Sequence, residues 1–251
     1  MGVNIEDGKS VYTRIPIEQR ENLKLYKTVR EAVERNLAPG GTVLDIGCSD
    51  LVASRKLAQS GYNVVGVELD FYSLKAGLAG HCNASLVNAD ALRLPIGKIG
   101  ANSCALLLDV LEHFKEDKAV DLLKFIGKTI QPDAIILTMP IISIYSVSTA
   151  QEFLNMVLSE KRPHTGLFDR THHILTDKNG HEKIFNNAGF RIVDSSPILR
   201  SPNSSVKGRL YGLVTEKIIP SIASAPTKIL KQDITNALQA YQYMYIIKKN
   251  S

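Results

Sequence analysis

Apolar residues along this chain form short continuous runs that alternate with longer segments in which they recur every three or four positions. The continuous runs predict strands buried on both faces, at 42–46, 63–69, 84–87, 103–108 and 134–139. The segments with a 3.6-residue period predict amphipathic helices at 22–37, 51–60, 73–81 and 117–130. Buried strands that alternate with helices are typical of a parallel sheet covered on both sides. The expected fold class is therefore α/β, with a doubly wound sheet.

The alternation weakens in the last part of the chain. Two further helices and then two further strands are expected, at 151–161, 177–188, 190–193 and 241–249. The intervening segment 198–240 contains three prolines, which limit it to short helices. No linker divides the chain, so residues 1–251 are expected to form a single domain.

Composition narrows the class of protein. The chain has 251 residues, of which 44% are hydrophobic, which is typical of a packed domain and argues against a disordered chain. Its three cysteines lack the paired spacing of zinc sites, and an odd number makes a poor disulfide framework. The most apolar stretch, 134–147, is interrupted by Thr138, Pro140 and Ser143, and no basic leader with an apolar segment precedes it. A soluble protein of the reducing cytoplasm, with no membrane span, is expected.

Positive charge is concentrated near the C-terminus. The formal net charge is +5, and residues 198–251 hold eight Lys or Arg against two acidic residues. These cations are scattered singly along the segment, apart from Lys248 and Lys249. A solvated surface and a contact with a nucleic acid or another anionic partner both remain open.

Three positions at the ends of the first three strands suit a nucleoside cofactor. Gly47 follows the first strand, where a residue without Cβ lets a ligand approach the backbone. Glu68 ends the second strand 21 residues later, where a carboxylate can accept hydrogen bonds from ribose hydroxyls. Asp90 follows the third strand and could accept a hydrogen bond from an adenine amino group. Each position alone is equally well explained as a turn or a solvated strand end, so the three together carry the prediction.

An ordered series of motifs carries a resemblance to a known family. The motifs are VLDIGC at 43–48, VGVE at 65–68, NADALRLP at 88–95, LDVLEHF at 108–114, FDRTHH at 168–173 and NAGF at 187–190. The series resembles the class I S-adenosylmethionine-dependent methyltransferases, close to the type 11 group, most specifically over residues 42–140. The resemblance implies a Rossmann-like, seven-stranded sheet of order 3-2-1-4-5-7-6, with strand seven antiparallel.

The resemblance also implies S-adenosylmethionine as the cofactor and assigns residues to it. Asp45 would interact with the methionine amino group, directly or through water, Glu68 with the ribose hydroxyls, and Asp90 with the adenine amine. The expected cofactor-binding set is Asp45, Gly47, Cys48, Ser49, Glu68, Leu69, Asp90, Ala91, Asp109 and Val110. Cys48 could also be a nucleophile by its position, but no histidine is near it in sequence, and packing as a small residue is favoured.

The resemblance places further segments around the cofactor. A Rossmann-like core is expected at 40–197, with an N-terminal helix at 17–37 over or beside the cofactor site. Residues 141–175 are expected to form a lid on the acceptor side, which would exclude water during the reaction. Residues 198–251 form a C-terminal segment that ends in the last strand.

The turn after the first strand departs from the family pattern. The family commonly has glycines where this chain has Ser49 and Leu51, so Leu51 is expected to crowd the start of the next helix and to weaken cofactor binding. NAD, the alternative cofactor, needs G-x-G-x-x-G at this turn, and only one of these glycines is present. Acidic residues around the turn favour a cationic ligand without phosphate; they are Asp45, Asp50 and Glu68.

Methyl transfer from a sulfonium requires positioning and exclusion of water, with a base only where the acceptor loses a proton. His113 is the candidate base, and anchoring of the following segment is its alternative role. His172 and His173 could line the acceptor pocket or serve the structure of their loop. His164 and His181 are expected at the surface. No metal site is expected, because no two histidines lie four residues apart on a helix with an acid between them.

The expected function is methyl transfer to a small molecule or a glycan precursor. The stretch from Asp169 to His172 is similar to methyltransferases found with polysaccharide biosynthesis, and no separate RNA-binding domain is visible. Two alternatives remain: an RNA-directed methyltransferase that uses the basic C-terminal segment, and a protein that binds the cofactor without transferring its methyl group.

Overall fold

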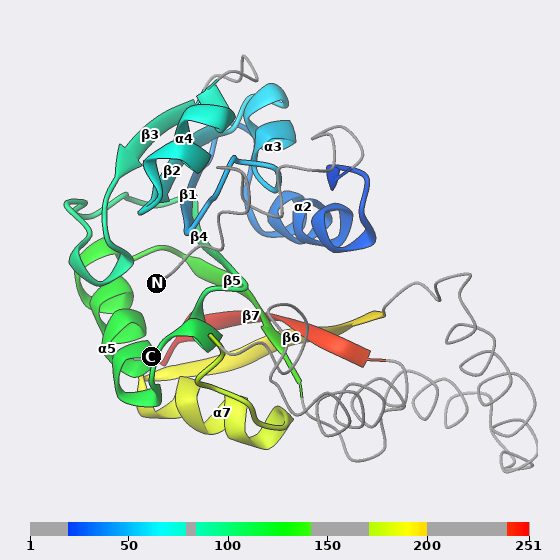
Figure 1. Cartoon of the computed structure of the whole chain (residues 1–251), viewed down its shortest axis with the longest axis vertical. Coiled ribbons are helices and arrows are strands. Elements are labelled where there is room, and N and C mark those ends of the chain that lie inside the picture. Colours follow the sequence, from blue (N-terminus) through cyan, green and yellow to red (C-terminus); the bar gives the residue numbers. More distant parts are fainter. Residues whose placement is uncertain (1–19, 79–83, 142–170, 200–239, 251) are drawn as a thin grey trace, which may run out of the picture.

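A computed structural model of the chain describes residues 20–78, 84–141, 171–199 and 240–250 (Figure 1). Their centre is one seven-stranded sheet of order β3-β2-β1-β4-β5-β7-β6, in which the first five strands are parallel and β7 runs antiparallel to β5 and β6. The strands are β1 Thr42–Ile46, β2 Asn63–Glu68, β3 Ala84–Asn88, β4 Ser103–Leu108, β5 Ala134–Pro140, β6 Phe190–Leu199 and β7 Ala240–Lys249. The predicted fold class and strand order are confirmed.

Helices cover both faces of the sheet (Figure 1). One face carries α2 Lys24–Asn36, α3 Arg55–Gln59 and α4 Phe71–Leu78. The other carries α5 Glu116–Phe125, its π-helical continuation η4 Ile126–Ile130, and α7 Lys178–Asn187. Two short 3-10 turns follow strands, η2 Ala91–Arg93 after β3 and η3 Leu111–His113 after β4. Among the described residues, no helix is both long and apolar enough to cross a membrane.

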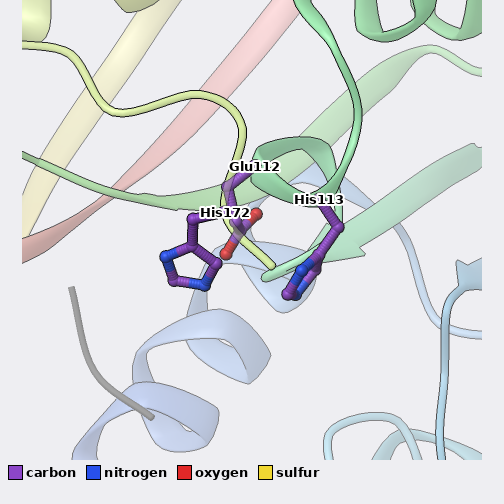
Figure 2. A group of neighbouring side chains, drawn as sticks. All are labelled: Glu112, His113 and His172. Atoms are coloured by element: carbon purple, nitrogen blue, oxygen red, sulfur yellow. The ribbon is translucent and has the colours of Figure 1, made fainter. Parts of the chain in front are cut away.

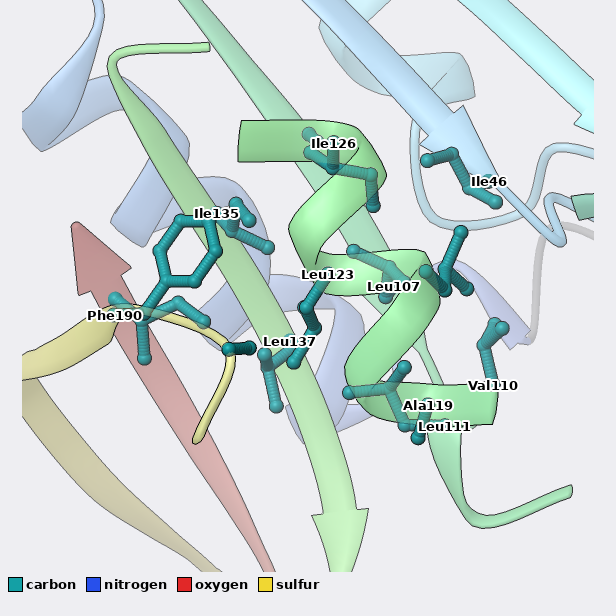
Figure 3. Close-up of a cluster of buried hydrophobic side chains, with 14 of the residues drawn as sticks. Ile46, Leu107, Val110, Leu111, Ala119, Leu123, Ile126, Ile135, Leu137 and Phe190 are labelled. Atoms are coloured by element: carbon teal, nitrogen blue, oxygen red, sulfur yellow. The ribbon is translucent and has the colours of Figure 1, made fainter. Parts of the chain in front are cut away.

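The central strands are apolar at consecutive positions because each of their faces meets a different layer of helices. In β4, Cys104 and Leu106 join the cluster under α2 and α3, whereas Ala105 and Leu107 join the cluster under α5 and α7. Figure 3 shows the second cluster, in which Leu123 of α5 lies among side chains of the central strands. Alternating side-chain directions along a strand therefore produce two cores from one apolar run.

Three predicted elements differ from the observed ones. The helix expected at 51–60 begins only at Arg55, because Ser49 and Leu51 have positive φ angles of 49° and 62° and the chain turns before it can become helical. The helix expected at 117–130 spans that region but ends as a π-helix, and Gln131 closes it in the left-handed conformation. The strand expected at 190–193 continues to Leu199, because its pairing with β7 extends that far.

Several predictions fall on residues outside the described ranges. The helix at 151–161 lies wholly outside them, as do most of the lid at 141–175 and most of the C-terminal segment at 198–251. The N-terminal helix expected at 17–37 is described from residue 20 and is helical as α2. The single-domain assignment and the lid stay predictions.

Candidate functional site

A cavity of about 160 Å³ lies at the carboxyl ends of β1, β2 and β4. Strand order reverses between β1 and β4, and open α/β sheets bind their ligands at such a point. The lining residues are Gly47, Val67, Glu68, Leu69, Ala89, Asp90, Ala91, Asp109, Val110, His113 and Phe114. The lining includes seven of the ten expected cofactor residues and the candidate base, whereas Asp45, Cys48 and Ser49 are not part of it.

Gly47 is required at the turn after β1 for two reasons. Its φ of 74° is a conformation that side chains disfavour. A Cβ at this position would lie 2.7 Å from Cγ2 of Val110, which also lines the cavity. The N–H groups of Gly47 and Cys48 both donate to the carbonyl of Val67, at 2.8 and 3.1 Å. The turn is thus bound to β2 and passes directly beside Val110.

Glu68 is held in place by backbone donors on both sides. Its Oε2 accepts a hydrogen bond from the N–H of Ser49 at 2.9 Å, and its Oε1 accepts one from the N–H of Asp70 at 2.9 Å. A carboxylate has about four lone-pair sites, so both oxygens keep capacity to accept from a ligand. The positive φ of Ser49 is part of the turn that brings its N–H to Glu68. Ser49 therefore contributes to the site by orienting Glu68.

Asp90 closes the neighbouring wall of the cavity. Its Oδ1 accepts from the N–H of Leu92 at 2.9 Å and caps the 3-10 turn η2. The side chain of Asn88 donates to the carbonyls of Glu68 and Leu69, at 2.8 and 2.9 Å. The loop after β3 is thereby tied to the loop after β2, and the two acidic walls are fixed relative to each other. Sequence reasoning missed the bridging role of Asn88.

Asp109, at the cavity, is hydrogen-bonded to residues of β5 and β7, which lie later in the chain. It has a φ of 56°, its N–H donates to Oγ1 of Thr138 at 3.0 Å, and that hydroxyl donates to Asp109 Oδ1 at 2.8 Å. The side-chain amide of Gln242 donates to the same oxygen. Burial raises the pKa of Asp109, and the hydrogen bond from Thr138 and the nearby His113 counteract part of that rise. Thr138 and Gln242 are positioning residues that no local motif indicated.

Asp45 lies behind the turn, fully buried, and does not line the cavity. Its Oδ2 accepts a hydrogen bond from Oγ of Ser54 at 2.6 Å, and burial raises its pKa to about 6. Burial also raises the pKa of the Cys48 thiol, with a smaller contribution from the negative charge of Asp45. A thiol held protonated is a poor nucleophile, so the geometry favours packing for Cys48.

Leu51 occupies the core instead of the cavity. Its side chain is fully buried, and a Cβ added to Gly66 of β2 would lie 2.7 Å from Leu51 Cδ2 and 2.9 Å from Cys48 Sγ. Gly66 thus provides the space that Leu51 fills. The crowding expected at the helix start is avoided, because the chain turns through a positive φ at Leu51 and α3 begins later.

The segment before α2 is anchored beside the turn that follows β1. Arg20 donates from Nη1 to Asp50 Oδ1 at 3.1 Å and from Nη2 to Oδ2, and both residues are buried. Glu21 lies 3.6 Å from Nε of Arg55 and 3.8 Å from Nζ of Lys56. Sequence reasoning counted Asp50 among the acids facing a cationic ligand, but its charge is met by Arg20. The pairing of Arg20 with Asp50 had no signal in the spacing.

A cluster of three side chains stands at the edge of the cavity: Glu112 and His113 from η3, and His172 from the loop before α7 (Figure 2). Their candidate ligand atoms all lie within 4.8 Å of one another, and the two imidazole rings are 5.0 Å apart at 66°. Nδ1 of His113 lies 3.1 Å from Oγ1 of Thr171. Sequence reasoning named both histidines but overlooked Glu112.

Glu112 is buried, and its Oε2 has no hydrogen-bond partner. Burial raises the pKa of this carboxyl well above its usual range, and the negative charge of Asp109 adds to the rise. The backbone carbonyl of Glu112 accepts from the N–H groups of His173 and Ile174, at 2.7 and 3.2 Å. The side chain of His173 is exposed, so the loop presents only His172 to the cluster.

The prediction that His181 lies at the surface is wrong. His181 is fully buried, and its Nδ1 lies 2.9 Å from the hydroxyl of Tyr245. Burial lowers its pKa to about 4. Its place on the inner face of α7, one turn from Phe185, explains the burial and was visible in the helical period. His164 lies outside the described residues.

Residues 44–138 match the family described as the type 11 methyltransferase domain. The sequence has no match among curated proteins. The match confirms the resemblance over residues 44–138, a range that contains every expected cofactor residue.

The fold is similar to solved methyltransferase structures. Magnesium protoporphyrin IX methyltransferase from Synechocystis, with bound SAH, is 16% identical with a TM-score of 0.57 over 97% of this chain and 90% of that chain. A SAM-dependent methyltransferase from Archaeoglobus fulgidus is 18% identical with a TM-score of 0.58 over 94% and 96%. A small RNA methyltransferase is 15% identical with a TM-score of 0.56 over 90% of this chain and 25% of that chain. At these identities the similarity establishes the shared fold.

Proposed function

We propose that this chain, whose residues 44–138 match a methyltransferase domain, binds S-adenosylmethionine and transfers its methyl group to a small molecule or a glycan precursor. The observation that carries the proposal is the cavity at the point where strand order reverses. Around it lie one glycine turn and the acidic residues that end β2, β3 and β4. The order of these residues along the chain is that of the family.

Each wall of the cavity is suited to one part of the cofactor. Glu68, fixed by two backbone donors, would accept hydrogen bonds from the ribose hydroxyls. Asp90 would accept one from the adenine amine, and the backbone of Asp109 and Val110 would contact the methionine portion. Asp45, buried behind the turn, would reach the methionine amino group through water.

The electrostatics of the turn favour this cofactor over NAD. A pyrophosphate needs N–H groups that point freely out of a glycine-rich turn. Here the N–H groups of Gly47 and Cys48 are bonded to Val67, and that of Ser49 is bonded to Glu68. Two carboxylates nearby, Asp45 and Glu68, would repel a phosphate and attract a sulfonium or an ammonium group. The pairing of Asp50 with Arg20 reduces this attraction without reversing it.

The transfer itself is an in-line displacement. A lone pair on the acceptor atom forms a bond to the methyl carbon, the bond from carbon to sulfur breaks, and its electron pair stays on sulfur as the neutral thioether. An acceptor hydroxyl would also lose its proton, and His113 at the cavity wall is placed to receive it. The contact between Nδ1 of His113 and Thr171 orients the ring. His172 and His173 belong to the acceptor side in this proposal.

The acceptor class is the least constrained part of the proposal. The solved relatives have acceptors as different as a porphyrin and a small RNA, so the fold does not select one. A small acceptor suits the described residues, which form one sheet with its covering helices and no second domain. The basic C-terminal segment keeps the RNA alternative open, and charge reversal at Lys207, Arg209, Lys228 and Lys231 tests it. Steeply salt-dependent RNA binding that is lost in this variant would favour RNA as the acceptor.

The compartment is proposed from the thiols. Among the described residues, Cys48 and Cys104 are buried and free. Two free thiols suit a reducing compartment, which supports the cytoplasm as the site of action.

The test is a calorimetric titration of the full chain with S-adenosylmethionine, S-adenosylhomocysteine and NAD in parallel. We expect micromolar binding of the first two and no heat from NAD. Glu68→Ala should weaken the binding of S-adenosylmethionine by about 1–3 kcal/mol, because hydrogen bonds to a charged group are lost. NAD binding, or the absence of any binding, would contradict the proposed cofactor. Binding without turnover on any acceptor of either class would favour the non-catalytic alternative.

A further inference from the structure

We propose that Glu112, His113 and His172 bind a divalent transition-metal ion at the edge of the cavity. Their candidate ligand atoms lie within 4.8 Å of one another, and Figure 2 shows the three side chains converging from two segments of the chain. Bonds from zinc to these ligand types are about 2.0–2.2 Å, so the ligand atoms of a tetrahedral site lie about 3.3–3.6 Å apart. A closure of at most about 1.5 Å, which side-chain rotation can supply, therefore suffices to form the site.

The two segments are fixed to each other without an ion. The carbonyl of Glu112 accepts hydrogen bonds from the N–H groups of His173 and Ile174, at 2.7 and 3.2 Å. These bonds place His172 opposite η3, so the backbone sets the distance between the ligands. A site whose ligands are held by the backbone loses little conformational entropy when the ion binds.

Glu112 gives an independent indication of a missing partner. Its carboxyl is buried with 1% of its surface exposed, and Oε2 has no hydrogen-bond partner. A buried polar atom without a partner costs free energy, and a buried charge costs more unless an opposite charge meets it. No lysine or arginine forms an ion pair with Glu112 among the described residues. A bound cation would supply both the charge and the missing contact.

The ligand types indicate the class of ion. Two imidazoles and one carboxylate suit zinc, iron, cobalt or manganese, whereas calcium and magnesium prefer sites made only of oxygen. Histidines that bind metals commonly use their second ring nitrogen to bond a neighbouring group, which sets the orientation of the ring. The contact between His113 Nδ1 and Thr171 Oγ1 at 3.1 Å has this form.

Three protein ligands leave coordination positions open for an oxygen atom from outside the protein. His113 also lines the cavity, so such an oxygen would lie beside the proposed site of the methyl group. The site would thereby select acceptors that present a hydroxyl, and His113 would act as a ligand in place of a base. This step rests on the proposed function, whereas binding of the ion does not.

The test uses the full chain, freed of metal with a chelator and then dialysed. Zinc is titrated by calorimetry, and cobalt(II) is followed by its visible absorption, which reports ligand geometry. We expect one ion per chain at this site. Glu112→Gln and His172→Ala should each weaken binding by more than ~100-fold, beyond what loss of an orienting partner costs. Thr171→Val should weaken it by about 10- to 100-fold.

His173→Ala is the matched control, because it removes a neighbouring imidazole whose side chain is exposed and outside the cluster. It should keep the affinity of the native chain. Circular dichroism and the thermal midpoint establish that each variant is folded, and Glu112→Gln keeps the volume of the side chain. Binding that is absent from the native chain, survives both ligand variants, or falls equally in the control overturns the site. Ion binding without S-adenosylmethionine binding would instead contradict only the proposed function.

Discussion

The cavity under the ends of β1 and β2 and the cluster after β4 are neighbours that are assembled across very different sequence distances. Contacts between the turns that follow β1 and β2 are short in sequence, as with Ser49 and Glu68, which are 19 residues apart. After β4, His113 of the cluster contacts Thr171 over 58 residues, and Asp109, which lines the cavity, contacts Gln242 over 133. Strand-end turns therefore build the side of the cavity at β1 and β2, which we propose binds the cofactor, and segments from the far end of the chain support the side at β4, where we propose that the acceptor binds.

This difference suggests that the two sides respond differently to substitution. Backbone conformation and close packing dominate the cofactor side, as Gly47 and Gly66 show. Buried polar and titratable groups dominate near β7 and the cluster, as Glu112, Asp109 and His181 show. Glycine substitutions on the first side should appear as steric effects, whereas changes of buried titratable groups, including Asp45 behind the first side, should appear as effects of pH or ions.

Gly47→Ala should have the largest effect on the cofactor side. An alanine here would have to adopt a φ of 74°, and its Cβ would lie 2.7 Å from Val110 Cγ2. Backbone strain and steric overlap together should lower the free energy of unfolding by about 2–5 kcal/mol. Gly61→Ala is the control, because its φ of 89° is strained but nothing lies within 4 Å. It should cost only about 1–2 kcal/mol. Urea unfolding and titration with S-adenosylmethionine are measured for both variants. Equal losses of stability in the two variants would mean that the Val110 side chain moves away from the new Cβ without cost.

His181 should make stability depend on pH on the other side of the sheet. Its pKa in the folded chain is about 4, below the ordinary value of 6.5, so the folded state favours the neutral ring. This contribution is fully present above pH ~6.5 and is lost as the pH falls through about 4. The difference of about 2.5 units corresponds to about 3 kcal/mol. Urea unfolding between pH 4 and pH 7 should show this slope, and His181→Gln should flatten it.

The exposed His173 provides the comparison for that measurement. His173→Gln removes a histidine without touching the buried pair of His181 and Tyr245. Its pH profile should follow that of the native chain. A profile as flat as that of His181→Gln would assign the slope to the wrong histidine.

Asp45→Asn should stabilise the folded chain at neutral pH and weaken the binding of the cofactor. Burial raises the pKa of Asp45 from 3.8 to about 6, so its charged form costs up to about 3 kcal/mol above pH 6, and this cost disappears as the pH falls toward 4. Asparagine keeps an acceptor for Ser54. Thermal midpoints at pH 7 and calorimetry with S-adenosylmethionine give the two readouts. Lower stability together with unchanged affinity would remove Asp45 from the site.

Gly66→Ala should have the smallest effect, and a second change should offset part of it. Its Cβ would lie 2.7 Å from Leu51 Cδ2 and 2.9 Å from both Cys48 Sγ and Leu86 Cδ2, which predicts a loss of about 1–3 kcal/mol from overpacking. Leu51→Ala in the same chain removes the nearest of these atoms. A double-mutant cycle by urea unfolding should give a coupling of about 0.5–3 kcal/mol. Additive effects would show that Leu51 and Gly66 do not share this space.

Seven of the ten residues expected to bind the cofactor line one cavity, because each of the seven lies at or just after the end of a strand. The glycine, the acid of β2 and the acid after β3 are fixed by strand register and by the parallel order of the sheet. The conformation at Ser49 and Leu51 was not predicted, because the family pattern says nothing of positive φ angles or of the space left by Gly66. Whether this turn binds the cofactor more weakly than a glycine-rich one stays a prediction.

The cluster was missed for a physical reason. A metal site was sought as two histidines on one helix, but Glu112 and His113 are adjacent and their third partner comes from a loop 59 residues away. Hydrogen bonds between the backbones, together with the contacts of His113 with Thr171 and His172, bring these segments together. Nothing in local periodicity encodes such a contact.

By itself, the sequence determined the alternation of strands and helices, the sheet order through its family motifs, and the acidic ends of β2 and β3. Those features depend on hydrophobic period and on residues next to one another in the chain. The tertiary structure alone decided the pairing of Arg20 with Asp50, the burial of His181, and the meeting of Glu112 with His172. These three features depend on how segments distant in sequence pack against each other. Packing decides which side chains are buried and which charges meet, and it exists only in the folded chain.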